Sequence, residues 1–159
     1  MHKKILFFSL ILFILSSNIS YSQEKAKLNK DDIIYSITVN KDFETVVGEI
    51  RDAIIDRNFK ITRENEISKG MVYYRGGEMY DYKIIEFCNL TLCGDMLKKE
   101  PDIGAFMPTG ITIYAKGKQT VLVTKRLSYM LNAFPNTEVK KEVEKLEKEV
   151  FEIMESVKK

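Results

Sequence analysis

The sequence predicts an α+β domain, with an antiparallel sheet, helices packed on one face and a long C-terminal helix. Two observations lead to this class. Apolar residues alternate with polar ones in several short segments, which indicates strands, and recur at helical spacing in two longer segments. The order is strand, helix, several strands with a short helix among them, and a long helix. Strands joined in hairpins, with helices on one face, are typical of α+β domains.

The N-terminus has the pattern of a secretory signal peptide over residues 1–22. Lys3 and Lys4 precede an apolar run over residues 5–15, and Ser20 and Ser22 fit a small-x-small cleavage site before Gln23. The run is shorter than the ~20 residues needed to cross a bilayer. We therefore expect an exported protein, most readily periplasmic, with no membrane span after cleavage; an uncleaved anchor is the alternative. A flexible lead-in over 23–31 and a single α+β domain over 32–159 are expected to follow.

The amino-acid composition excludes several classes of function. Cleavage leaves 23 of the 25 basic residues against 23 acidic ones, a balance unlike the basic surface of a nucleic-acid-binding protein. The single histidine, His2, lies in the signal segment. The mature chain therefore has no histidine that could activate a nucleophile, act as a general base or bind a metal. No catalytic residue, metal site or cofactor is expected.

Each element of the first half has a local signal. Residues 32–40 alternate as a half-buried strand. Asp42 is a suitable N-cap for a helix that ends at Asn58, a residue type that accepts the left-handed C′ conformation. Residues 59–64 resume as a strand. Gly76-Gly77 predicts a hairpin within residues 65–79, and Tyr80–Cys88 form the next strand.

The second half begins with a short helix over 89–99 and a loop from Pro101 to Pro108. Two strands flank Lys116-Gly117-Lys118 as a hairpin, and residues 126–136 are expected to be irregular. The last helix covers about 137–157. Its apolar residues form a narrow seam, which indicates either a surface helix lying across the sheet, the interpretation we favour, or a dimer contact. The seam consists of Val139, Val143, Leu146, Val150, Ile153 and Val157.

Cys88 and Cys93, the two cysteines of the chain, flank a strand-to-helix junction. If Asn89 is the N-cap, Cys88 and Cys93 occupy the N′ and N4 positions, which touch in a hydrophobic staple. Three interpretations remain open: apolar packing partners, which we favour, a disulfide, or a working thiol at Cys93. The C-x₄-C spacing differs from that of C-x-x-C redox sites, and two thiols alone make a poor metal site.

The segment "YKIIEFCNLTL…ML…PDIGAFMPTGITIYAKGKQTVLV" resembles the family called domain of unknown function 302. The matching features are Cys88-Asn89, Met96-Leu97, Asp102-Ile103-Gly104, Pro108 and the hairpin around Gly117. The resemblance covers about residues 30–157. It implies a curved antiparallel sheet of the TATA-box-binding-protein-like fold class and suggests homodimers. Leu90 replaces a usual proline, and Thr109 stands where many members have a cysteine.

These observations support two candidate functions. The first is an exported, non-enzymatic binding or accessory domain for a small ligand or a protein partner, with Asp102, Gly104 and Pro108 marking a candidate ligand loop. The second is a periplasmic thiol-dependent redox or sulfur-handling protein that uses Cys88 and Cys93. A structural homodimer is a further option. We favour the first function.

Overall fold

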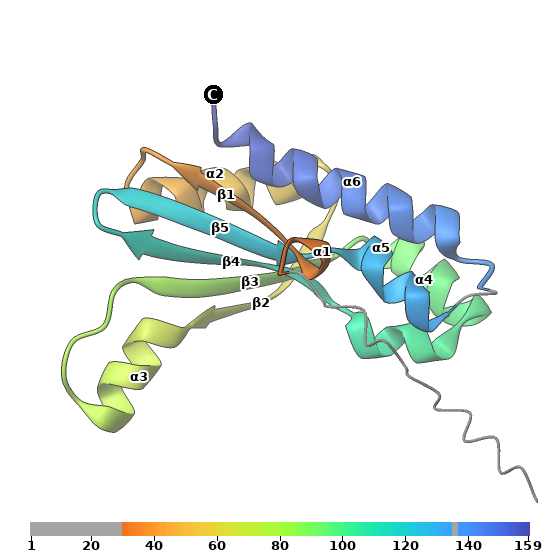
Figure 1. Cartoon of the computed structure of the whole chain (residues 1–159), viewed down its shortest axis with the longest axis horizontal. Coiled ribbons are helices and arrows are strands. Elements are labelled where there is room, and N and C mark those ends of the chain that lie inside the picture. Colours follow the sequence, from red (N-terminus) through yellow and green to blue (C-terminus); the bar gives the residue numbers. More distant parts are fainter. Residues whose placement is uncertain (1–29, 135–136) are drawn as a thin grey trace, which may run out of the picture.

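The computed structural model describes residues 30–134 and 137–159, so the predicted signal peptide and most of the lead-in lie outside the described residues. Its centre is an open five-stranded antiparallel sheet with the order β1-β5-β4-β3-β2 (Figure 1). The strands are β1 (Ile34–Val39), β2 (Lys60–Glu66), β3 (Tyr82–Cys88), β4 (Thr109–Lys116) and β5 (Gln119–Lys125). The α+β class is confirmed.

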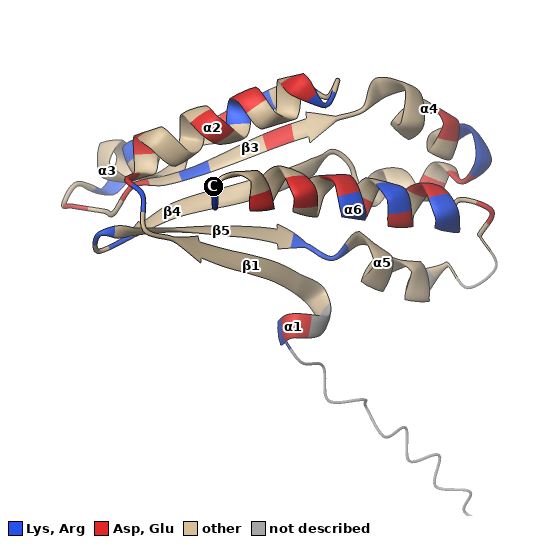
Figure 2. Cartoon of the chain, turned by 90° about the horizontal axis from the view of Figure 1, so that it is seen from above, with Lys and Arg blue, Asp and Glu red and all other residues tan. Residues whose placement is uncertain are grey.

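Two long helices, α2 (Phe43–Asp56) and α6 (Lys140–Ser156), lie side by side on one face of the sheet (Figures 1 and 2). Shorter helices gather at the two ends of the strands, with α3 at one end and α4 and α5 at the other. None of the helices in the described residues is long and apolar enough for a membrane crossing. The shorter helices are α1 (Lys30–Ile33), α3 (Ile67–Arg75), α4 (Leu90–Lys99), η1 (Pro101–Phe106), α5 (Leu127–Met130) and η2 (Leu131–Ala133).

The core fills the space between the sheet and the two long helices. Ile85 pairs with Ile111, and Ile113 pairs with Leu122, so that these four side chains point to the same face. All four are fully buried. They belong to one apolar cluster with α2 and α6, to which α2 contributes Val46, Val47, Ile50 and Ile54 and α6 contributes Val143, Leu146, Val150 and Ile153. Burial of this face therefore holds the two layers together.

The seam of α6 is buried within this chain. Its six apolar residues are at most 4% exposed, and the helix contacts β1, α2 and α5. Between these apolar residues the helix carries many acidic and basic residues (Figure 2), among them the ion pairs Lys140–Glu144, Lys145–Glu149 and Lys148–Glu152. The surface-helix interpretation is thus confirmed, and a dimer would have to use another surface. Six residues of this kind cannot serve both contacts at once.

Two local predictions in the first half are confirmed. Asp42 caps α2, because its side chain accepts a hydrogen bond from the Thr45 N–H at 2.9 Å. Asn58 has a positive φ of 59° just after the C-cap Arg57, as expected for the C′ residue. The hairpin between β4 and β5 is also present, with Gly117 at φ 63°.

Residues 65–79 contain a helix where the sequence predicts a hairpin. α3 occupies residues 67–75, and Gly76 and Gly77 follow it with φ of 70° and 82°. Glycines with positive φ end helices as well as forming hairpin turns, so the Gly-Gly pair marks the end of a helix here. None of the α3 side chains is buried, which explains why its apolar pattern gave no clear period.

Three smaller predictions are also wrong. Asp32 and Ile33 belong to α1 instead of to the first strand. The loop from Pro101 contains the 3₁₀ helix η1, and the expected irregular segment after Arg126 contains α5 and η2. Helices of three to six residues have too few periodic positions to be recognised from sequence.

Tyr35 joins β1 to the C-terminal turn of α6. Its ring stacks on Phe151 with centroids 4.0 Å apart, and its hydroxyl donates a hydrogen bond to Glu155. Burial, followed by the hydrogen bond and negative charge of Glu155, raises the pKa of Tyr35 from 10.0 to about 12. The folded state thus keeps a proton that the unfolded state loses above pH 10.

Raising the pH from 10 through 12 is therefore expected to destabilise the wild-type protein more than a Tyr35→Phe variant. Below pH 10 the contribution of this proton is fully present, and it is lost as the pH rises through the folded-state pKa. Urea unfolding at pH 9, 10, 11 and 12 measures the difference between the two proteins. A constant difference across these pH values would contradict the raised pKa.

Candidate functional site

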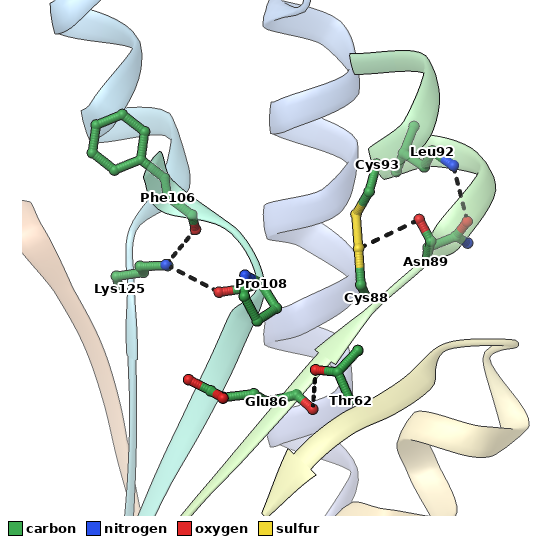
Figure 3. The surroundings of a disulfide bond; sticks show 9 residues. All are labelled: Thr62, Glu86, Cys88, Asn89, Leu92, Cys93, Phe106, Pro108 and Lys125. Carbon is green, nitrogen blue, oxygen red and sulfur yellow. Dashed lines mark hydrogen bonds between the residues drawn. A yellow bond between two sulfur atoms is a disulfide. The ribbon is translucent and has the colours of Figure 1, made fainter. Parts of the chain in front are cut away.

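The junction between β3 and α4 positions the two cysteines. Asn89 has an extended backbone, and its Oδ1 accepts a hydrogen bond from the Leu92 N–H at 3.1 Å (Figure 3). Its carbonyl oxygen accepts the N–H of Cys93 at 2.8 Å. Asn89 is therefore placed as the N-cap of α4, with Cys88 at N′ and Cys93 at N4.

Replacing Asn89 by alanine is expected to lower the free energy of unfolding by about 1 kcal/mol, the usual cost of a lost N-cap. Asn89→Ser is the matched control, because a serine hydroxyl can accept the same N–H, and it should stay close to wild type. Denaturant unfolding of the three proteins measures both values. Equal loss in the alanine and serine variants would contradict the capping role.

The sulfur atoms of Cys88 and Cys93 are joined in a disulfide (Figure 3). The Cα atoms lie 6.7 Å apart, and both residues are buried, at 8% and 5% exposure. The pair thus occupies the staple positions and is also bonded, whereas the sequence favoured packing without a bond. A bonded sulfur has no proton to donate, so the 3.7 Å approach of Cys88 Sγ to the Asn89 carbonyl is only a contact.

An apolar pocket lies beside Cys93. It is bounded by α4, η1, the first residue of β4, α5, η2 and α6. The cavity volume is about 20 Å³, so the pocket is a narrow crevice with room for roughly one water molecule. Its lining residues are Cys93, Met96, Ile103, Phe106, Met107, Thr109, Leu127, Met130, Leu131, Phe134, Val143 and Leu146.

Thr109 is the polar member of this lining. It is 3% exposed, and its Oγ1 has no hydrogen-bond partner among the described residues. The other buried threonines of the sheet differ. The hydroxyl of Thr120 donates to the Lys41 carbonyl and that of Thr124 donates to the Gly110 carbonyl, both at 2.8 Å. A buried hydroxyl without a partner costs free energy, so Thr109 marks the pocket as a place where a polar atom of a ligand would be stabilised.

The predicted ligand loop borders the pocket, but through residues other than those singled out. Asp102 and Pro108 are exposed, and Gly104 lies against α4, where a Cβ would come within 3.1 Å of Leu97 Cδ2. The lining is contributed by Ile103, Phe106 and Met107. Sequence alone could not separate these apolar residues from ordinary core residues, because both have the same pattern.

A family model described as "Domain of unknown function DUF302" matches residues 35–157 of the chain. This protein belongs to the DUF302 family. A solved structure, that of the uncharacterised conserved DUF302 protein from Bacillus stearothermophilus, has the same fold with a TM-score of 0.71. The likeness covers 77% of this chain and 95% of that one at 13% identity. No curated protein matches the sequence.

The DUF302 match includes the cysteine junction, the pocket and α6. Thr109, at the position where the resemblance implies a cysteine in many members, faces the same pocket as Cys93. Leu90, at the position of the usual proline, is 61% exposed at N1 of α4. The two departures therefore differ in consequence, because only Thr109 changes the chemistry of the pocket.

Lys125 holds the segment Phe106–Pro108, which leads into β4. Its Nζ donates to the Phe106 carbonyl and, at 3.3 Å, to the Pro108 carbonyl (Figure 3). Burial lowers the pKa of Lys125, while the charge of Glu86 opposes this change. The ammonium group thus fixes the two residues on either side of Met107, and Thr109 follows directly.

The chemistry of the site follows from these residues. The lining is apolar apart from one hydroxyl and the bonded sulfur of Cys93, and it contains no titratable side chain. Within residues 30–134 and 137–159, no group of three histidine, cysteine or acidic side chains is arranged to hold a metal ion. The arrangement is suited to holding an apolar molecule, with a disulfide at its wall.

Proposed function

We propose that this DUF302 protein is an exported binding domain that holds a small, largely apolar molecule in the pocket beside Cys93. The observation that carries the proposal is the buried Thr109 hydroxyl, without a protein partner among the described residues, in an otherwise apolar crevice. Apolar walls with a small number of placed polar groups are typical of small-molecule sites.

Three of the side chains that would have to move to admit a ligand are flexible methionines. Met96 in α4, Met107 just after η1 and Met130 in α5 line the crevice. Methionine is unbranched and fills irregular spaces, so that these side chains can adapt to a guest at low cost. This adaptability supports a binding function in a pocket whose free space is small.

Native mass spectrometry of protein purified from the periplasm tests the proposal directly. We expect a species heavier than the polypeptide, whose extra mass is lost on mild collisional activation. A Leu146→Phe variant, which places a larger side chain in the pocket wall, should lose the added mass while remaining folded by circular dichroism. The same added mass in the variant would place the ligand elsewhere and sink the proposal.

Export is the second part of the proposal and rests on residues 1–22. N-terminal sequencing of protein from the periplasmic fraction should give a start at or within a few residues of Gln23. Intact Met1 on the periplasmic species would favour the uncleaved anchor instead.

A thiol–disulfide function is the second candidate, because Cys93 is bonded to Cys88 and also faces the pocket. A dithiol substrate would attack one sulfur of the bond, pass through a mixed disulfide and leave oxidised, while Cys88 and Cys93 gain two electrons and two protons. Equilibration with mixtures of reduced and oxidised dithiothreitol, followed by alkylation and mass analysis, measures this exchange. A pair that stays fully oxidised throughout would exclude the role.

We also propose two properties that the resemblance to the family implies. The first is membership of the TATA-box-binding-protein-like fold class, without a nucleic-acid partner. The second is a homodimer, which would need a surface other than the α6 seam. Analytical ultracentrifugation at several concentrations separates monomer from dimer.

A further inference from the structure

We infer that the pocket selects a neutral, slender molecule with an apolar body and one hydrogen-bonding group, such as a hydroxyl or carbonyl, that meets Thr109 Oγ1. This inference rests on the proposed binding function and specifies its ligand class. It excludes anions, polyols and bulky fused rings as ligands of this site.

Charge gives the first restriction. No charged side chain lines the pocket. Lys99 pairs with Glu142 at 2.7 Å, Lys140 pairs with Glu144 at 3.9 Å, and Lys125 donates to the Phe106 and Pro108 carbonyls. An ion buried without a counter-charge is strongly disfavoured. A carboxylate or ammonium ligand would therefore lose its hydration and gain no opposite charge from the lining.

Polarity gives the second restriction. A threonine hydroxyl can donate one hydrogen bond and accept others, so it can pair with an alcohol, a ketone or an aldehyde. The remaining lining side chains are aliphatic, aromatic or sulfur-containing. A single polar group on the ligand would be paired, whereas a second one placed among these side chains would be unpaired and costly.

Shape gives the third restriction. The crevice has a cavity volume of only about 20 Å³, so any guest must widen it by moving side chains. Rotation of the methionine side chains can widen it for an alkyl chain. A rigid, wide ring system would instead have to displace Val143 and Leu146, which are anchored in the α6 core.

Nuclear magnetic resonance with ¹³C-methyl methionine provides a local readout. Met96, Met107 and Met130 line the pocket, while Met71 lies on α3 and Met154 is buried elsewhere on α6. Titration with 1-hexanol is expected to shift the first three signals and leave Met71 and Met154 unchanged. Hexanoate and 1,6-hexanediol should each bind at least about tenfold more weakly than 1-hexanol, because each brings a charged or second polar group into the apolar lining.

Two variants isolate the hydroxyl. Thr109→Val keeps the shape and removes the oxygen, and it should weaken 1-hexanol binding about fivefold to tenfold, the effect of one lost hydrogen bond. Thr109→Ser keeps the hydroxyl and should retain most of the affinity. An unchanged Met154 signal shows that each variant is folded.

The outcomes test the ligand class and the binding site separately. If 1-hexanol shifts the pocket signals but Thr109→Val binds it as well as the wild type, or hexanoate binds equally, the ligand class is wrong and the binding site stands. If no probe shifts Met96, Met107 or Met130, the proposed function and this inference fail together.

Discussion

Replacing Ile153 by alanine should lower the free energy of unfolding by about 2–5 kcal/mol, the range for truncating a buried isoleucine. Ile153 is fully buried on the inner face of α6, in the cluster that α2 and the sheet share. Little can fill the space left behind, because the neighbouring side chains are held by two helices and the sheet. Urea unfolding followed by circular dichroism measures the loss.

Ile55→Ala is the matched control for this prediction. Ile55 also lies on a long helix, α2, but it is 61% exposed. The same truncation should therefore change stability by less than about 0.5 kcal/mol. If the two variants were equally stable, α6 would not be lying on the sheet as described, and its apolar seam would be available for contact with a second chain.

Reduction of the disulfide should destabilise the folded wild type by roughly 2 kcal/mol. The bond joins residues five positions apart, and the chain-entropy relation gives about this value for so short a ring. Thermal or urea unfolding with and without tris(2-carboxyethyl)phosphine measures the difference. The shape of the apolar pocket should also change on reduction, because Cys93 forms part of its wall.

A Cys88→Ala, Cys93→Ala double variant is the control for the reductant itself. It should lose the stabilisation of the bond and a further ~1–3 kcal/mol of packing, and its stability should be the same in oxidising and reducing buffer. If the wild type also ignored reductant and alkylated slowly when unreduced, the cysteines would be unbonded packing partners. Rapid labelling of Cys93 by iodoacetamide at pH 7 in the unreduced protein would instead favour a working thiol.

Local signals predicted a large part of this fold. Asp42, Asn58 and Asn89 act through the backbone of their own turn, so the ends of α2 and the start of α4 could be located from neighbouring residues. The hairpin at Gly117 and the periodic seam of α6 are signals of the same kind. The sequence by itself also placed Cys88 and Cys93 together across one helical turn.

Only the tertiary structure decided which face of each element is buried and what meets there. Lys83, in an alternating strand, points to the helix side, where it is 4% exposed and pairs with Glu66 at 3.1 Å. Thr109 gave no local signal beyond its place after Pro108, and its unpaired hydroxyl is apparent only once α4, α5 and α6 surround it. The pocket is lined by residues from Cys93 to Leu146, brought together by long-range packing. Caps and turns depend on atoms a few residues apart, whereas burial and polar pairing depend on segments whose approach the local sequence does not encode.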